Sequence, residues 1–405
     1  MPPPRILTQL NEELADLDAR CLRRILRALP APGPIATVDG RELVNLASND
    51  YLGLGTHDHL RRRGADATLA LGTGAGASRL VAGHLALHEQ VESRFARFKH
   101  AEAALLLPTG YMANLAVLTS LAGPGDLVCL DKLVHASLID AARASEATVR
   151  THPHGDLRRL EHLLARPLPA SPGRRPPRRF IVTDSIFSMD GDAADLPALC
   201  DLADAHDAML VVDEAHATGV LGATGAGLCE AQHVAERVAT RGVVVSTASK
   251  GLGGLGGVVT GPRVVIDTLV NRARSLIYTT AVPPGQAAAI DAALDVVASE
   301  PWRRERVAAM AHRVRDELRD AGWALPTTAP ATPIIPLIVG AADRALALAA
   351  HLRDAGLLAV AIRPPTVAPN TARVRISLRA DLADQHIDRL LDGVATWCGQ
   401  AATYS

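Results

Sequence analysis

The stretch VVVSTASKGLGG, residues 243–254, decides the fold of this chain together with the earlier stretch MLVVDEAH, residues 209–216. Each begins with a short, fully apolar run, which is typical of a strand buried on both faces of a parallel sheet. Each then changes to polar residues: Asp213 follows the first run, and Lys250 enters a glycine-rich turn after the second. Because ligands bind beyond the carboxyl ends of parallel strands, we expect both side chains at one site.

The same pattern recurs along the middle of the chain. Short apolar runs predict strands near 104–107, 127–130, 180–183 and 256–260, and helical spacing predicts helices near 85–99, 112–121 and 136–147. Strands that alternate with helices indicate βαβ units. We therefore predict an α/β fold with a large, mainly parallel sheet and helices on both faces.

The two ends of the chain have a different pattern. Leucine and isoleucine at helical spacing predict an amphipathic helix over 5–29, ended by Pro30, and a short β segment follows at 42–46. From about 284, helices are expected at 284–299, 301–321, 342–355 and 384–398, with strands at 333–339 and 373–378, and the Pro- and Arg-rich stretch 167–179 is expected to be a surface loop. These patterns predict an N-terminal segment (1–47), a large α/β domain (48–285) and a smaller α+β C-terminal domain (286–405).

Composition excludes several classes of function. The 405 residues include 42 basic and 43 acidic side chains, a net charge of −1, and only 3% aromatic residues, which argues against a nucleic-acid binder. No apolar run is long enough to span a membrane, and no signal segment follows the first residues. The five cysteines are scattered without a C-x-x-C pair, so we expect neither a disulfide framework nor a zinc site, and a cytoplasmic location fits best.

Lys250 and Asp213 together indicate a pyridoxal phosphate (PLP) enzyme. Such an enzyme needs a lysine that holds the cofactor as a Schiff base and a carboxylate that keeps the pyridine nitrogen protonated. The glycines after Lys250 allow a planar group to approach the backbone closely. Asp213 could instead bind a metal or ribose hydroxyls, with His216 as a second metal ligand, but no third ligand follows at a plausible spacing and we expect no metal.

The PLP hypothesis also predicts functions for other residues. His135 follows the strand expected at 127–130; alone it is more often structural, but beside PLP an imidazole stacked on the ring is favoured. Gly110 and Tyr111 lie between a strand and a helix, where free amide groups suit a phosphate. The glycine-rich run 72–79 follows no strand and is expected to line a substrate site rather than to bind a dinucleotide. Arg363 is either a carboxylate clamp or part of a surface salt bridge.

Six runs of sequence together resemble the α-oxoamine synthases. They are SNDYLGL (48–54), FSMDGD (187–192), VDEAHATG (212–219), TASK (247–250), AIRPPTV (361–367) and TARVRIS (371–377). The resemblance spans nearly the whole chain and implies the aspartate-aminotransferase-like fold, fold type I of the PLP-dependent enzymes. The last two runs are most similar to the biotin-pathway branch of the family.

This resemblance implies a role for each matching residue. Lys250 would hold PLP covalently, Asp213 would pair with its pyridine nitrogen, and His135 would stack on its ring. His216 would bond its phenolic oxygen, with Ser188 nearby. Gly110, Tyr111 and Thr247 would bind its phosphate, and Thr279 and Thr280 would complete the phosphate site of the partner in a homodimer. Asn49 and Arg363 would hold the substrate carboxylate. Thr366 and Arg27, the latter on the N-terminal helix close to Arg23 and Arg24, would contact substrate.

The resemblance also implies an activity, namely the decarboxylative condensation of L-alanine with a pimeloyl thioester carried on CoA or on an acyl carrier protein. Lys250 would remove the α-proton as a general base. Within the family, a ligase for glycine and acetyl-CoA or an enzyme that acts like serine palmitoyltransferase are alternatives. A non-catalytic subunit with the same fold would lack Lys250, and a dinucleotide oxidoreductase would carry a glycine fingerprint after an early strand.

Overall fold

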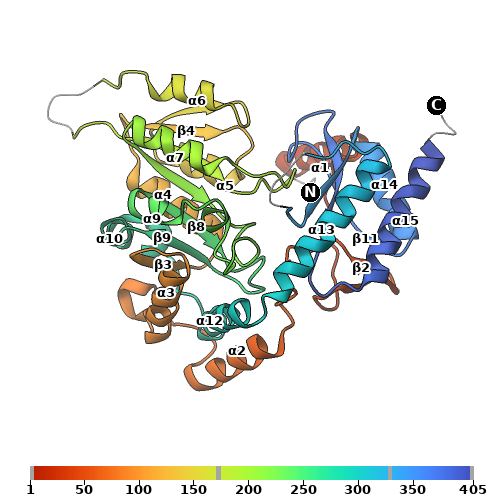
Figure 1. Ribbon diagram of the computed structural model, residues 1–405, viewed down its shortest axis with the longest axis horizontal. Helices are drawn as coiled ribbons and strands as arrows, with labels where there is room; N and C mark the ends of the chain where they lie inside the picture. The colour runs from red at the N-terminus through yellow and green to blue at the C-terminus, as the bar shows by residue number, and fades with distance from the viewer. Residues whose placement is uncertain (1–3, 170–174, 327–330, 402–405) are drawn as a thin grey trace.

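A seven-stranded sheet forms the centre of the larger part of the molecule (Figure 1). The computed structural model describes residues 4–169, 175–326 and 331–401. The order of the strands is β3-β9-β8-β7-β6-β4-β5, and β4 to β8 run parallel, while β9 is antiparallel to both β8 and β3. The strands are β3 (Ala103–Leu107), β4 (Leu127–Asp131), β5 (Thr148–His152), β6 (Arg179–Asp184), β7 (Ala208–Asp213), β8 (Gly242–Thr247) and β9 (Gly257–Gly261). The predicted mainly parallel sheet is confirmed.

Helices cover both faces of this sheet, as the side chains of β3 demonstrate. Leu105 and Leu107 belong to one apolar core with α4, whereas Leu106 points into a second core with α3 and α12. Burial on both faces explains the continuous apolar runs of the strands. The helices of this part are α2 (Asp58–Leu71), α3 (Ala86–Phe98), α4 (Gly110–Leu121), α5 (Ala136–Ala144), α6 (Leu157–Leu164), α7 (Leu196–Ala205), α8 (Leu228–Ala231), α9 (Ala235–Arg241), α10 (Arg263–Arg272), α11 (Arg274–Ile277) and α12 (Pro284–Ser299), with a π-helical turn at Arg79–Gly83.

The smaller part of the molecule contains two three-stranded sheets. One sheet has the order β10-β13-β12, and the other has the order β1-β2-β11, in which β2 pairs in parallel with β11 through Val44 and Leu357. N-terminal and C-terminal segments therefore share a sheet. The elements are α1 (Arg5–Ala19), β1 (Ile35–Val38), β2 (Arg41–Asn45), α13 (Trp302–Asp320), β10 (Ile334–Gly340), α14 (Ala342–Asp354), β11 (Leu357–Leu358), β12 (Val360–Ile362), β13 (Ala372–Ser377) and α15 (Asp384–Ala401).

The helix predicted over 5–29 is wrong at its C-terminal end, because α1 stops at Ala19. Cys21 has a φ of 54°, its amide donates to the Asp18 carbonyl, and the amide of Leu22 donates to the Leu17 carbonyl. These two bonds are those of a Schellman motif, which ends a helix without a proline. Arg27 therefore does not lie on the N-terminal helix.

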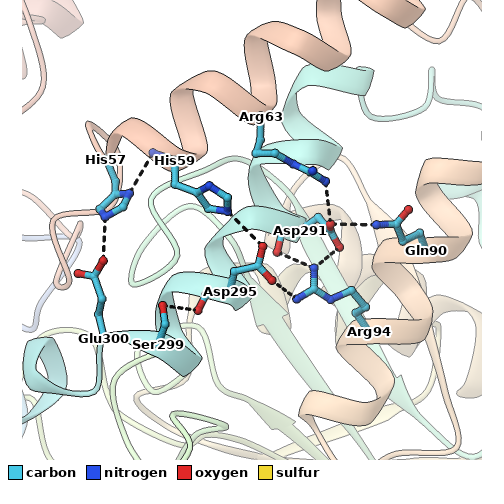
Figure 2. A network of polar contacts seen from close by, with 9 residues as sticks. All are labelled: His57, His59, Arg63, Gln90, Arg94, Asp291, Asp295, Ser299 and Glu300. Carbon is cyan, nitrogen blue, oxygen red and sulfur yellow. Dashed lines mark hydrogen bonds and ion pairs between the residues drawn. The ribbon is translucent and has the colours of Figure 1, made fainter.

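Helix α12 packs on the larger part of the molecule, where a polar network joins it to α2 and α3 (Figure 2). The buried Asp291 carboxylate lies 2.8 Å from Arg94 Nη1 and accepts hydrogen bonds from Gln90 and Arg63. One turn later, Asp295 lies 3.1 Å from His59 Nε2. The domain limits 1–47, 48–285 and 286–405 stay a prediction, and the packing of α12 favours a boundary that lies after this helix.

Candidate active site

The carboxyl ends of β6, β7 and β8 bring the polar residues of the site together. Asp184 and Asp213 end two neighbouring strands and pair directly in the register of the sheet, and β8 delivers Thr247 and then Lys250 beside them. A cavity of about 240 Å³ lies over this edge. The predicted residues that line it are Gly110, Tyr111, His135, Asp213, His216, Thr247 and Lys250.

Lys250 is one of three lysines in the chain, and the other two are placed differently. Lys99 is buried in an ion pair with Glu214, and Lys132 is exposed. Lys250 faces the cavity with its Nζ 2.8 Å from His216 Nε2. Burial lowers the pKa of the Lys250 amine to about 8, although the charges of Asp213 and Asp184 oppose this shift. A lowered pKa increases the share of the neutral amine, which is the nucleophilic form, at neutral pH.

His216 connects Lys250 to the N-terminal half of the chain. Its Nδ1 lies 2.6 Å from the hydroxyl of the buried Tyr51, on the side opposite Lys250. Burial, and then the positive charge of Lys250, hold the pKa of His216 well below its usual value, so the ring is neutral. His216 can thus accept or donate one hydrogen bond at each nitrogen without adding charge to the site.

Asp213 is held by donors that fix its carboxylate. Its Oδ2 accepts a bond of 2.7 Å from Asn114 on α4, and its Oδ1 accepts a bond of 2.8 Å from the amide of Ala215. Asn114 also donates to Ser137, while its own Oδ1 is buried and has no partner among the described residues. A carboxylate oriented in this way on the cavity wall suits a protonated ring nitrogen.

His135 lies at the N-cap of α5 and is locked there from two sides. Its Nδ1 is 2.7 Å from Ser137 Oγ, and its amide donates to both oxygens of Asp184 at 3.2 Å. Burial lowers the pKa of His135 and raises the pKa of Asp184 well above its usual value. A neutral imidazole on the cavity wall presents a flat face on which an aromatic ring can stack.

The N-terminus of α4 provides the third wall of the cavity. Thr109 caps this helix by accepting a bond from the amide of Met112, so the helix begins with Gly110 at the cavity. A Cβ on Gly110 would lie 3.3 Å from the Cβ of Thr247, closer than side chains ordinarily pack, so glycine allows the helix to meet the end of β8. Amide groups at the start of a helix and the hydroxyls of Thr247 and Ser249 together suit a phosphate.

Six predicted residues lie elsewhere. Ser188 is in the turn after β6, where its carbonyl accepts a bond from Arg375, and Thr279 and Thr280 follow α11. Arg363 donates to the carbonyls of Cys21 and Arg23, and the exposed Thr366 accepts a bond from Arg24. Arg27 is exposed on the segment after α1. Asn49 lies near the cavity, where it accepts bonds from Tyr51 and Arg375.

Arg375 is the residue that sequence reasoning missed. It lies on β13, and its guanidinium donates to Asn49 Oδ1, to the Ser188 carbonyl and to Ser377 Oγ. It reaches the site through Asn49, whose Oδ1 also accepts from Tyr51, the hydrogen-bond partner of His216, and its positive charge contributes to the low pKa values of Lys250 and His216. In the run TARVRIS, Arg373 and Arg375 lie two residues apart and so project from the same face of the strand, and the sequence does not indicate which of them reaches the site.

The residues present fit PLP. A lysine amine, an oriented carboxylate, a flat neutral imidazole and a helix N-terminus line one cavity, and each suits a different chemical group of the cofactor. No cluster of three metal-ligating side chains occurs within residues 4–169, 175–326 and 331–401. The helices in the described part of the chain include none that is long and apolar enough to span a membrane.

Comparisons with known proteins identify the family of this chain. The family described as aminotransferase class I and II matches residues 41–394. The putative 8-amino-7-oxononanoate synthase of Geobacillus kaustophilus is 45% identical over 96% of this chain and 97% of its own. The 8-amino-7-oxononanoate synthase of Anaeromyxobacter dehalogenans (strain 2CP-1) is 46% identical over 96% of this chain and 95% of its own.

Solved structures agree as well. A serine palmitoyltransferase from S. paucimobilis with a bound PLP–myriocin aldimine has a TM-score of 0.90 at 26% identity and covers 100% of both chains. An 8-amino-7-oxononanoate synthase from Francisella tularensis has a TM-score of 0.75 at 25% identity and covers 89% of this chain and 99% of its own. The chain therefore belongs to the class I and II aminotransferase family of PLP-dependent enzymes, and within it to the group that contains the 8-amino-7-oxononanoate synthases.

Proposed function

We propose that this protein catalyses the reaction for which its relatives are named, the formation of 8-amino-7-oxononanoate, CO2 and a free thiol from L-alanine and a pimeloyl thioester. The observation that carries the proposal is the placement of Lys250 and Asp213 on one cavity at the carboxyl ends of parallel strands. Identities of 45–47% to proteins with this name support the choice of substrates.

PLP, when bound, supplies an electron sink for the negative charge that develops at Cα of the amino acid. Lys250 would hold the cofactor and, once displaced by the substrate amine, would take the proton from Cα with a pKa suited to a general base. Asp213 would keep the ring nitrogen protonated, and His135 would stack on the ring. The amides of Gly110 and Tyr111, with the Thr247 hydroxyl, would bind the phosphate.

Arg375, with Asn49, is our choice for the carboxylate of the amino acid. A guanidinium can bind a carboxylate through two parallel hydrogen bonds, and that of Arg375 is linked through Asn49 and Tyr51 to His216 on the cavity wall. In the condensation, Lys250 would take the proton from Cα, the new C–C bond would form between Cα and the thioester carbonyl carbon, and the C–S bond would break, with the thiolate taking a proton from solvent. Loss of the former amino-acid carboxylate as CO2 would leave an electron pair at Cα, to which Lys250 would return its proton.

Further parts of the proposal rest on the relatives. We propose a homodimer in which Thr279 and Thr280 complete the partner's phosphate site, a cytoplasmic location, and either CoA or an acyl carrier protein as the carrier of the pimeloyl group. Arg27, Arg363, Thr366 and Ser188 stay predictions as substrate or cofactor contacts. Condensation of serine with a long-chain thioester is a second candidate, favoured by TM-scores of 0.89–0.90 to serine palmitoyltransferases.

One experiment separates these activities. Alanine, serine and glycine are offered to the holoenzyme against pimeloyl, acetyl and palmitoyl thioesters, and thiol release is followed with a thiol reagent. We expect release with L-alanine and the pimeloyl thioester, and none for Lys250→Ala, while Lys132→Ala serves as the matched lysine control. Borohydride reduction followed by peptide mass mapping should find the cofactor on Lys250. Turnover by K250A, or the cofactor on Lys132, would contradict the proposal.

A further inference from the structure

His154 lies outside the cavity, just after β5, and bridges two carboxylates. Its Nδ1 is 3.0 Å from Asp131 Oδ1, and its Nε2 is 2.6 Å from Asp192 Oδ2. Its ring stands nearly perpendicular to that of Phe187, with 4.3 Å between the centroids. The hydrogen bonds to Asp131 and then to Asp192 raise the pKa of His154 to about 10. At neutral pH both ring nitrogens therefore carry a proton and donate.

Asp131 belongs to the segment that carries His135. It is the last residue of β4, and its carboxylate accepts bonds of 2.8 Å from the amide of Leu133 and 3.0 Å from the amide of Gly155. These bonds shape the turn that leads to His135, whose ring lines the cavity. One end of the His154 bridge is thus fixed to the wall on which the cofactor ring would stack.

Asp192 belongs to a different segment, the turn 187–192, which contacts the smaller part of the molecule. The turn is closed by a bond of 3.0 Å from the Phe187 amide to the Asp192 carbonyl. Within it, the Ser188 carbonyl accepts a bond of 3.1 Å from Arg375 Nη1, and Arg373 pairs with Asp190. The other end of the bridge is thus fixed to the turn that positions Arg375.

The turn has little freedom to adopt another position. Gly191 has a φ of 72°, and a Cβ there would lie 2.4 Å from the Ile334 carbonyl on β10. The Oδ1 atom of Asp192 is buried and finds no partner in the part of the chain that the structure describes, so His154 is the donor that compensates this carboxylate. Without His154, two carboxylates would face each other with no cation between them.

We propose that His154 is a positioning residue for the amino-acid substrate. It holds the turn 187–192, which contacts Arg375, at a fixed distance from the segment that leads from Asp131 to His135. The inference rests on the proposed function, because it assigns the substrate carboxylate to Arg375. The hydrogen bonds of the His154 ring go to Asp131 and Asp192, and none joins it to Lys250, Asp213 or Gly110, so the loss of the bridge weakens the binding of the substrate carboxylate more than the binding of the cofactor.

The test compares two ligands on the holoenzyme of His154→Gln. L-alanine and L-alaninol have the same amine, but only L-alanine has a carboxylate, and each is titrated by the absorbance change of the bound cofactor. We expect the dissociation constant of L-alanine to rise about tenfold, within the usual range of coupling between two sites. The constant for L-alaninol and the PLP content should stay within about twofold of wild type.

A second variant separates the bridge from a general effect on the fold. In H154Q/D192N the glutamine carbonyl can accept from the new amide at position 192 while the glutamine amide still donates to Asp131. This bridge, in which only Asp131 keeps a charge, should recover at least about half of the lost free energy of alanine binding. If H154Q weakens both ligands equally, changes neither, or is not rescued, the proposal is overturned. If wild type responds to serine or glycine instead of alanine, only the proposed function fails, and the same comparison is made with that amino acid and its alcohol.

Discussion

The buried ion pair between Lys99 and Glu214 gives a sharp prediction for Lys99→Met. Lys99 Nζ donates to Glu214 Oε2 at 2.6 Å and to Thr218 Oγ1 at 2.9 Å, and both charged side chains are almost fully buried. Glu214 also accepts a bond of 2.7 Å from the amide of Cys229. Removing one partner of such a pair leaves an uncompensated buried charge and costs about 3–5 kcal/mol.

This free energy converts to a measurable shift in the melting temperature. At about 2.1 cal/mol/K of unfolding entropy per residue, a chain of 405 residues loses about 1.2 °C for each kcal/mol. We therefore expect the Tm of the K99M holoenzyme to fall by about 4–6 °C at fixed protein and PLP concentration. Calorimetry or near-ultraviolet circular dichroism can follow the transition.

The double variant K99M/E214Q tests the reasoning itself. Neutralising Glu214 removes the buried charge while the amide oxygen can still accept from Cys229, so the double variant should recover at least about half of the loss. A decrease below about 1 °C for K99M, or a double variant that melts lower than K99M, would refute the argument that the uncompensated charge dominates.

Three further predictions concern the site and the network of α12. Arg375→Gln should raise the dissociation constant of L-alanine by about 10- to 100-fold, whereas Arg363→Gln should change it less than about threefold, and the reverse order in a titration would restore the original assignment to Arg363. In the PLP-free protein, the reaction of Lys250 with an amine reagent should rise with pH through a midpoint near 8, because only the neutral amine reacts. A midpoint at the reference value for a lysine amine, about 10.4, in a mass-spectrometric rate measurement would contradict it. Asp291→Asn should lower the Tm by about 1–4 °C, because Arg94 and Arg63 lose a buried partner. The control variant, Asp58→Asn at an exposed position, should have a Tm within about 1 °C of wild type. Equal melting curves for the two variants would count against the network in Figure 2.

The strands of the large sheet could be predicted from the sequence because their burial leaves a simple signal. β6, β7 and β8 are covered on both faces and read as uninterrupted apolar runs. β5, with the sequence TVRTH, was missed because it lies at the edge of the sheet and most of its side chains are exposed. The formation of a strand at the edge of a sheet depends more on pairing with the neighbouring strand than on the composition of the strand itself.

The residues of the site likewise include some that the sequence predicts and some that it does not. Lys250, Asp213 and His135 were predicted because each follows a strand, and topology alone brings such positions to one edge. Arg375 contacts Asn49, 326 positions away in the chain, and Tyr51 contacts His216, 165 positions away, and nothing local in their sequence indicates this tertiary packing. Arg363 was favoured because it lies in a rigid proline-rich turn, yet that turn faces the segment after α1.

The pairing of β2 with β11 constrains how the protein is made. A ribosome that has just added residue 45 must add more than 300 further residues before Leu357, which pairs with Val44, is synthesised. During that time the hairpin of β1 and β2 lacks its third strand, while the central sheet, complete by residue 261, can already collapse. Limited proteolysis of nascent chains arrested before residue 357 should therefore cut within 35–45, and chains released after that point should resist cleavage there.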